Sequence, residues 1–447
     1  MGGRLGRRLS TDDATFPASL PSTSFQSEVW NMLTSVIDVA AYATGGLGTA
    51  VSPWVGWDTA LAWTGDRVYY FRPGHFTFTT TILLAEDDTT LMGAGSAATE
   101  LHFEPTAADT AIEFHHGVSQ STRVRLGGFL LTSAEVAVKK IGVDLVDVDI
   151  CDMGDIEIGP DGAWTGDTSV GLRVRGRQFG FIHQVAIMAD IPIQISDNPN
   201  NAVDIDHFHF QDCYLIANGN ECVLIDTGVN LYTVTFDGYQ AWVKGNDGLK
   251  WIDTTTTVAS IGLRLNNVRW EQEESATGYF VDIEHNTNLQ QFTISQCYGG
   301  LASRGFKLRK VKVADFIQVF YSGTGVAIDF DNTVYPVSFR NCFFQTASTL
   351  TTTGLTKIYD SGQSTFGGTI NHEVVYDLPS AATNAVTTIN STVSGRMTIP
   401  VVLTASLPLA AAANDGMIII EQGAAGDMNL VFYAAGERHR VDGAGNV

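Results

Sequence analysis

The sequence has few charged residues, and few of these are basic. Asp, Glu, Lys and Arg make up 17% of the 447 residues, and 26 Lys and Arg stand against 48 Asp and Glu, so the formal net charge is −22. With 44% hydrophobic residues, a chain this poor in charge is not intrinsically disordered. Its acidity argues against nucleic acid and anionic membranes as partners, because both would repel the body of the protein.

Cysteines and long apolar runs are scarce as well. The five cysteines show neither a CxxC pair nor metal-ligand spacing, so we expect no disulfide framework and no metal site. No stretch is long and apolar enough for a membrane-spanning helix, and no apolar run follows the first arginines as a secretory signal requires. Nucleotide-binding and nucleophile-elbow motifs are missing too, and we expect no cofactor. This pattern is typical of a protein made in the cytoplasm and exported only as part of a particle.

What the sequence does contain is a repeat of strand-like segments between about Val124 and Phe344. Each segment has a four-residue centre: a large apolar residue, any residue, a turn-former and a second apolar residue. Successive centres begin 22 to 32 residues apart, a spacing typical of the coils of a solenoid. They begin at Leu126, Ile150, Ile182, Phe210, Phe236, Leu265, Ile294, Phe316 and Phe339.

The third position of this centre predicts a sharp bend between two strands. Gly, Asn and Asp tolerate the left-handed backbone that such a bend needs, whereas Gln fits better a ladder of amides stacked along a solenoid axis. The residues there are Gly128, Asp152, Gln184, Asp212, Gly238, Asn267, Gln296, Gln318 and Asn341. Apolar residues alternate on both sides of the bend, so we predict a parallel β-helix whose coils stack about 4.8 Å apart around one core. Three cysteines share the fourth position and are interpreted as buried packing residues: Cys213, Cys297 and Cys342.

The first part of the repeat region resembles the opening of the pectate-lyase-like β-helices of phage tailspikes and related polysaccharide-active proteins. Six stretches carry the resemblance: Ile37 to Thr44, Gly45 to Gly48, Trp57 to Trp63, Val68 to Phe76, Leu91 to Gly95 and Thr99 to Phe103. Leu47 and Trp57 depart from it, because the family has aspartate at both places. The resemblance covers about Ile37 to Phe344 and is more specific for fold than for activity. It implies an all-β, single-stranded, right-handed parallel β-helix.

The composition divides the chain into five parts. We expect a virion-attachment arm over 1–36, the opening and cap of the β-helix over 37–110, its coils over 111–350, irregular strands over 351–413, and a C-terminal β element over 414–447. In the cap, Asp58 to Trp63 is predicted to form a short amphipathic helix, with Trp57 and Trp63 covering the apolar end of the first coil.

The two ends of the chain indicate partners. Candidate contacts of the arm to a neighbouring tail or baseplate protein are Arg4, Arg7, Arg8 and Trp30, and the alternative is a solvated leader. The C-terminal element contains Ile418, Ile419 and Ile420, which one copy alone would leave partly exposed. Three copies packed on an axis would bury these isoleucines, so we expect a homotrimer.

One candidate site for sugar chemistry combines tryptophan with glutamate. Sugar-degrading β-helices use paired carboxylates on their outer wall, about 5 to 9.5 Å apart, with aromatic faces beside them. Glu271 and Glu273 are the candidate catalytic pair, and Trp242 and Trp270 the candidate carbohydrate-binding residues, since Trp242 lies one coil before Glu271 at the same offset. The alternative is a solvated charged loop with one tryptophan covering a coil.

A second candidate site groups aspartates with histidines. Alternation puts Asp204, Asp206, His207 and His209 near one outward face, beside Asp237 on the next coil. An ordinary exposed strand face of an acidic protein would look the same.

These observations favour a trimeric tailspike or tail fibre of a phage virion that recognises host cell-surface polysaccharide, with or without depolymerase activity of the hydrolase or lyase type. Two alternatives stay open. A non-enzymatic appendage, such as a head fibre or baseplate component, should show no outward groove carrying both tryptophan and carboxylates. A free polysaccharide lyase or hydrolase should be a monomer.

Overall fold

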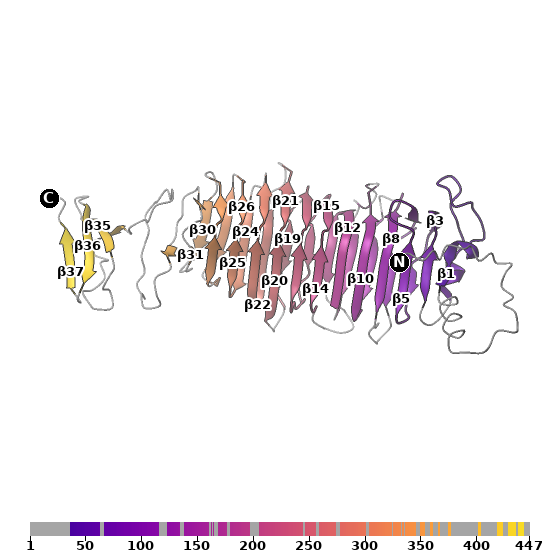
Figure 1. Ribbon diagram of the computed structural model, residues 1–447, viewed down its shortest axis with the longest axis horizontal. Helices are drawn as coiled ribbons and strands as arrows, with labels where there is room; N and C mark the ends of the chain where they lie inside the picture. Colours follow the sequence, from indigo (N-terminus) through magenta and orange to yellow (C-terminus); the bar gives the residue numbers. More distant parts are fainter. Residues whose placement is uncertain are drawn as a thin grey trace, which may run out of the picture.

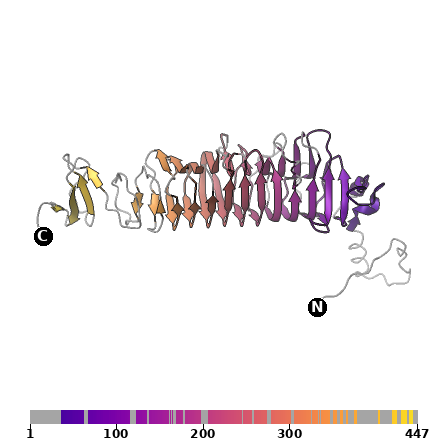
Figure 2. The same ribbon diagram turned by 90° about the horizontal axis from the view of Figure 1, so that it is seen from above.

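The protein is an elongated solenoid of parallel strands in this computed structural model (Figure 1, Figure 2). The structure describes residues 36–345 except 63–66, 116–122, 135–137, 161, 163, 165–168, 177–178, 197–204, 245, 256–258, 274–277, 301–303, 324, 332 and 335, together with the strands at 349–353, 358–360, 365–366, 374–376, 401–403, 418–422, 428–434 and 437–441. Within these residues, no helix has the length and apolar character needed to cross a membrane. The predicted fold class, an all-β parallel solenoid, is confirmed.

Each coil contributes one strand to each of three parallel sheets. Sheet 1 contains β1 (Val36–Asp38), β2 (Val68–Phe71), β5 (Thr89–Gly93), the first parts of β8 (Val124–Thr132), β10 (Ile150–Ile158) and β12 (Phe179–Ala189), then β14 (Phe208–Gln211), β17 (Val234–Asp237), β20 (Ser260–Asn266), the last part of β22 (Tyr279–Ser295), β25 (Ala314–Ile317), β28 (Val337–Arg340), β31 (Ile358–Asp360) and β33 (Val374–Tyr376).

The other two sheets complete the coil. Sheet 2 contains β3 (Gly74–Phe78), β6 (Thr99–Phe103), the second parts of β8, β10 and β12, then β15 (Tyr214–Ala217), β18 (Gln240–Val243), β21 (Arg269–Gln272), β23 (Tyr298–Gly300), β26 (Phe320–Tyr321), β29 (Phe343–Phe344) and β32 (Thr365–Phe366). Sheet 3 contains β4 (Ile82–Leu84), β7 (Asp109–His115), β9 (Lys140–Val146), β11 (Val170–Arg175), β13 (Ile191–Ser196), β16 (Val223–Ile225), β19 (Leu249–Ile252), the first part of β22, β24 (Arg304–Val311), β27 (Val326–Asp331) and β30 (Thr349–Thr353).

The predicted coil centres stack in one column with one exception. Leu126 pairs with Met153, and Met153 with Ile182, so the prediction of Ile150 and its bend residue Asp152 is wrong by three residues. The four residues from Ile150 and the four residues from Met153 both satisfy the pattern. Only pairing with the neighbouring coils selects those from Met153. From Ile182 to Phe339 every further pair is in the predicted register.

The bend column has left-handed backbone throughout. The φ angles are 72° at Gly128 and 64° at Gly238, and the other members lie between 50° and 54°: Asp155, Gln184, Asp212, Asn267, Gln296, Gln318 and Asn341. The glutamines, which we expected to fit an amide ladder better than this bend, adopt the left-handed conformation as well. A left-handed residue costs about 1–2 kcal/mol, whereas burying the apolar residues on either side of the bend contributes about 1.5–3 kcal/mol each. Burial therefore decides the backbone.

The core fills the space between the three sheets. The residues that follow the bend are at most 3% exposed: Phe129, Ile156, Val185, Cys213, Tyr239, Val268, Cys297, Val319 and Cys342. All five cysteines are buried, and none of them forms a disulfide. At the N-terminal end, Trp57 packs edge-on against Phe71 and Phe76, beside the 3₁₀ helix η3 (Asp58–Ala62). Trp63 lies outside the described residues.

A separate small sheet lies near the C-terminus. It contains β34 (Val401–Leu403), β35 (Ile418–Gln422), β36 (Met428–Ala434) and β37 (Glu437–Val441), with the first pair parallel and the others antiparallel. Its first strand comes from the part of the sequence that we assigned to irregular strands. The candidate attachment residues Arg4, Arg7, Arg8 and Trp30 lie outside the described residues.

Candidate functional site

The first predicted cluster is assembled only in part. Trp242 and Glu271 are register partners on β18 and β21, and both lie on the outward face of sheet 2. Trp270 is fully buried and stacks on Phe280 with ring centroids 5.5 Å apart. The proposal of Trp270 as a sugar-binding residue is therefore wrong, because alternation after the inward Val268 turns residue 270 into the core.

The two glutamates of this cluster have different surroundings. Glu271 forms an ion pair with Arg269, whose guanidinium also lies 5.8 Å from the ring centroid of Tyr298. The backbone N–H of Glu273 donates to Val243 O at 3.0 Å, and its side chain is half-buried. Trp242, Glu271 and Glu273 therefore remain a candidate sugar-binding surface without the second tryptophan.

The second predicted cluster is assembled only in part. Asp237 pairs in register with Gln211 and accepts a hydrogen bond from Asn266 Nδ2 at 2.9 Å. Asp206 precedes the first residue of β14 and pairs instead with His207. His207 has a positive φ of 43°, so the chain bends there and the predicted alternation is interrupted. Asp204 lies outside the described residues.

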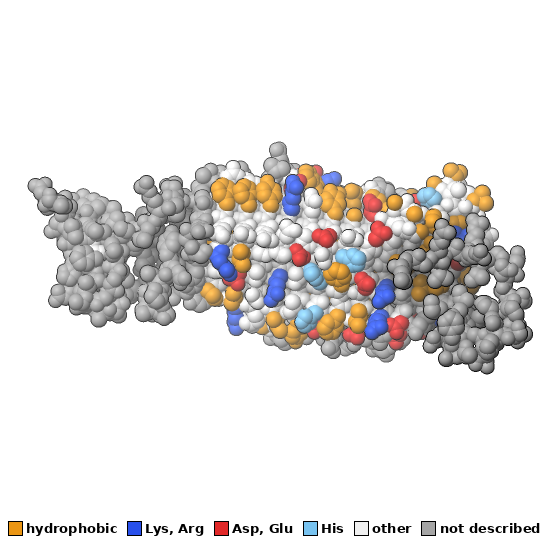
Figure 3. Space-filling model, in the orientation of Figure 1, with side chains coloured by type: hydrophobic (Ala, Val, Ile, Leu, Met, Phe, Trp, Pro, Cys, Tyr) orange, Lys and Arg blue, Asp and Glu red, His pale blue; other side chains and the backbone are white. Residues whose placement is uncertain are grey.

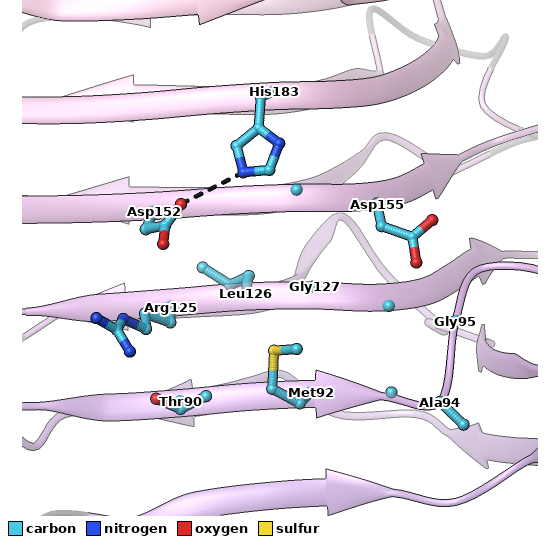
Figure 4. Close-up of a pocket in the computed structure, with 13 residues that line it drawn as sticks. Thr90, Met92, Ala94, Gly95, Arg125, Leu126, Gly127, Asp152, Asp155 and His183 are labelled. Carbon is cyan, nitrogen blue, oxygen red and sulfur yellow. Dashed lines mark ion pairs between the residues drawn. The ribbon is translucent and has the colours of Figure 1, made fainter. Parts of the chain in front are cut away.

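A groove of about 600 Å³ lies on the outer wall of sheet 1, on the coils of β5, β8, β10 and β12 (Figure 4). Its polar lining comes from different strands, and Asp152 and His183 lie side by side within it (Figure 4). The residues around it are Thr90, Met92, Gly93, Ala94, Gly95, Arg125, Leu126, Gly127, Gly128, Asp152, Gly154, Asp155 and His183.

Two glycines make the wall hollow here. Met92, Gly127, Gly154 and His183 occupy the same outward position on four successive coils. A Cβ on Gly127 would lie 2.7 Å from the Gly154 carbonyl oxygen, and a Cβ on Gly154 would lie 2.3 Å from the His183 ring. The imidazole therefore packs directly over the backbone of Gly154, and the groove opens between His183 and Met92.

The groove presents both hydrogen-bond donors and acceptors. Asp152 Oδ1 lies 3.5 Å from His183 Nε2, and the side chains are 51% and 34% exposed. Asp155 accepts a hydrogen bond from the Ser96 hydroxyl at 2.9 Å. Arg125 is exposed and forms no ion pair with any residue that the structure describes. A carboxylate, an imidazole and a guanidinium are thus available to a polar ligand.

Aromatic side chains continue the groove along sheet 1. Phe181 is 38% exposed and stacks on His183, with centroids 4.9 Å apart. On its other side it meets His209 edge-on at 5.5 Å. Phe179 stacks on His207 at 5.7 Å, with their planes 7° apart. We call Phe179, Phe181, His207 and His209 the aromatic platform, and Figure 3 shows histidine and hydrophobic side chains gathered there, over β12 and β14.

Sequence reasoning missed this groove. Its signal is the pair of glycines at the same outward position on neighbouring coils, Gly127 and Gly154. That coincidence becomes visible only when the β10 segment is shifted by three residues into its true register.

A serine, a histidine and an aspartate also meet inside the solenoid, although no triad motif marks them in the sequence. His285 Nε2 lies 3.1 Å from Ser260 Oγ, and His285 Nδ1 lies 3.9 Å from Asp253 Oδ2. The Ser260 hydroxyl donates to Asn230 Oδ1 at 2.8 Å, so its oxygen accepts from His285. Burial lowers the pKa of His285, and the nearby Asp253 opposes this shift. At 0 to 2% exposure the three residues form a structural network with no access for a substrate.

No protein-family model and no curated protein matches this chain. Solved structures with a similar fold include the gp42 tailspike of Acinetobacter phage vb_AbaP_AS12, at 12% identity over 92% of this chain and 78% of that chain, with a TM-score of 0.48. Tailspike protein 3 of bacteriophage CBA120 has 12% identity over 94% and 70%, with a TM-score of 0.45. ORF18 of Geobacillus virus E2 has 14% identity and a TM-score of 0.40, over 79% of this chain and 63% of that chain's length. These likenesses concern the fold alone.

Proposed function

We propose that this chain is a homotrimeric virion tailspike that recognises a polysaccharide of the host cell surface. The observation that carries the proposal is the groove on sheet 1 and its continuation, through His183, into the aromatic platform. The resemblance of the opening segment to tailspike β-helices supports the virion context. The attachment arm with Arg4, Arg7, Arg8 and Trp30 would join the chain to a tail or baseplate protein.

The chemistry of this surface suits a carbohydrate polymer. A sugar ring has an apolar face of C–H groups and a rim of hydroxyls. The exposed Phe181 offers the apolar contact, and Asp152, His183 and Arg125 offer acceptors and donors for hydroxyls. The groove has the volume of typical ligand sites. From β5 to β14 the surface crosses four coil spacings, about 19 Å, which favours a chain of sugars over a single one.

A glycan-binding experiment tests the proposal. Wild-type protein and Phe181→Ala are applied to a panel of immobilised bacterial capsular polysaccharides and lipopolysaccharides. We expect wild type to bind at least one glycan and Phe181→Ala to bind it about tenfold more weakly, a loss of about 1.4 kcal/mol. Tyr214→Ala is the matched control, because Tyr214 is 44% exposed but lies on sheet 2. Equal binding by Phe181→Ala and wild type would contradict the assignment of the site.

Depolymerase activity is a second candidate function of the same site. Two carboxylates, Asp152 and Asp155, line one groove, and a pair of carboxyl groups is what glycoside hydrolases use. We expect Asp152→Asn and Asp155→Asn to abolish the release of reducing ends from the bound polysaccharide while binding persists. Glu271→Gln and Glu273→Gln test the surface beside Trp242 in the same way, and a loss of activity in these variants alone would move the reaction to sheet 2.

Glycan binding and an N-terminal truncation distinguish the proposed tailspike from a purely structural appendage. We expect a ligand site to carry both tryptophan and carboxylates. Among the described lining residues the groove has carboxylates but no tryptophan, so it meets this expectation in part. A structural appendage would bind no glycan of the panel. Of the changes tested, only the removal of residues 1–35 would impair its function. For the tailspike, the same truncation should abolish incorporation into particles and leave glycan binding intact.

A further inference from the structure

One face of sheet 2 is free of charge over three successive coils. Its middle column is in register from coil to coil, and the other two columns lie two residues before and two residues after it on each coil. The nine residues, which we call the uncharged face, are Gln296, Gln318 and Asn341, then Tyr298, Phe320 and Phe343, then Gly300, Ser322 and Gln345. In a chain with a net charge of −22, nine adjacent positions without a charged side chain form a distinct surface.

An exposed column of aromatic rings runs along the middle of this face. Tyr298 is 40% exposed, and Phe320 and Phe343 are each 38% exposed. Tyr298 and Phe320 stack with centroids 5.3 Å apart, and Phe320 and Phe343 with centroids 4.8 Å apart. The column appears in Figure 3 as a row of hydrophobic side chains over β23, β26 and β29.

This face offers a sugar fewer charged contacts than the groove on sheet 1, because its nine residues include no carboxylate, imidazole or guanidinium. Each ring face is turned toward the next ring along the axis, so the edges of the rings point to solvent. At the N-terminal end of the column the guanidinium of Arg269 lies over the ring of Tyr298. What remains accessible is a flat apolar strip, which is typical of the core of a protein interface, where aromatic residues are enriched and charges depleted.

The flanks of the strip favour a second copy of the same chain. They carry the amides of Gln296, Gln318, Asn341 and Gln345, and each amide has both donors and an acceptor. Such a surface is complementary to itself, whereas an acidic or basic surface would need a partner of opposite charge. Each copy has a net charge of −22, so a contact through uncharged residues avoids the added repulsion of two acidic faces.

We propose that the uncharged face is the surface by which copies of this chain meet side by side, around an axis parallel to the solenoid. This inference rests on the homotrimer of the proposed function and names its contact surface. Because the strip runs parallel to the coil axis, straight copies can contact each other along its whole length.

Molar masses measured by light scattering during size-exclusion chromatography test the inference. We expect wild type to have the mass of three chains and Phe320→Asp to shift to the mass of one chain. Phe181→Asp is the matched control, because Phe181 has the same 38% exposure but lies on sheet 1, and it should stay at three chains. Gln318→Glu keeps the shape of the side chain and adds only a charge. If the like charges cost the trimer about 1.4 kcal/mol, its dissociation constant should rise about tenfold.

The outcomes separate the two proposals. Wild type at the mass of one chain would overturn the homotrimer and this inference with it, without touching glycan binding. Wild-type mass in both Phe320→Asp and Gln318→Glu would overturn the inference alone. If Phe320→Asp aggregates, Gln318→Glu decides by its dissociation constant. Loss of glycan binding in Phe320→Asp with the trimer retained would make the face a ligand site and overturn the inference.

Discussion

Replacing Asp247 by asparagine should stabilise the protein at neutral pH. Its carboxylate is 8% exposed, and burial raises its pKa from 3.8 to about 6, with Asp282 and Glu221 adding to the shift. The backbone N–H of Tyr279 donates to Asp247 Oδ1 at 2.5 Å, and an asparagine oxygen can accept the same bond. Lys250 keeps its ion pair with Glu221 at 2.7 Å. The substitution therefore removes a costly charge and retains the hydrogen bond.

The pH dependence gives the sign and the size of this effect. Below pH 3.8 the group is neutral in both the folded and the unfolded chain, and its charge costs nothing. Between pH 3.8 and about 6 it ionises more readily in the unfolded chain, so the fold loses stability as the pH rises. Above pH 6 the carboxylate is ionised in both states, and the fold bears the full cost of burying its charge. A shift of about two units corresponds to about 3 kcal/mol, or about 3 °C in the unfolding midpoint of a chain this long.

Thermal unfolding at two pH values measures this effect. Asp247→Asn should raise the midpoint by about 3 °C at pH 8 and leave it unchanged at pH 3.5. Glu284→Gln is the control: its carboxylate belongs to the same charge cluster but is 51% exposed, so its replacement should change stability by less than about 0.5 kcal/mol at either pH. A lower midpoint of Asp247→Asn at pH 8, or an equal shift at both pH values, would refute the desolvation argument.

Three further predictions concern the bend column, the core and the thiols. Gly238→Ala should destabilise the fold by about 1–2 kcal/mol, because φ is 64° there, and Gly238→Asn should cost less in the same melting assay. Phe316→Ala should cost about 3–5 kcal/mol, since this fully buried ring packs among other phenylalanines, and the exposed Phe320→Ala should cost far less. The thiols should react with dithionitrobenzoate at pH 8 only after unfolding, because burial raises the pKa to about 12 at Cys213, Cys222 and Cys297.

The fold was largely predictable because one coil repeats a pattern that few other architectures share. The bend column and the apolar residue after it identify the solenoid and its register from Ile182 to Phe339. The error at Ile150 arose because two overlapping tetrads in β10 fit the pattern equally well. Only hydrogen bonding to the neighbouring coils, which no single segment encodes, places Met153 in the column.

The candidate site was less predictable, because it depends on which side chains are absent and on how coils align. Trp270 was assigned outward although the alternation after Val268 already turns it inward. Asp237 was grouped with Asp206 because the positive φ of His207 is not visible in a strand pattern. The groove arises from missing side chains at Gly127 and Gly154, and it follows from the sequence only after the register is known.

Hydroxyl-radical footprinting with the polysaccharide that binds best tests the central claim most directly. Oxidation of side chains reports which of them the glycan covers. The account predicts that the glycan protects Met92, Phe181 and His183, and leaves Trp242 and Tyr298 as reactive as in the free protein. Protection of Trp242 or Tyr298, with Met92 and Phe181 unchanged, would place the ligand on sheet 2 and contradict the groove as the recognition site.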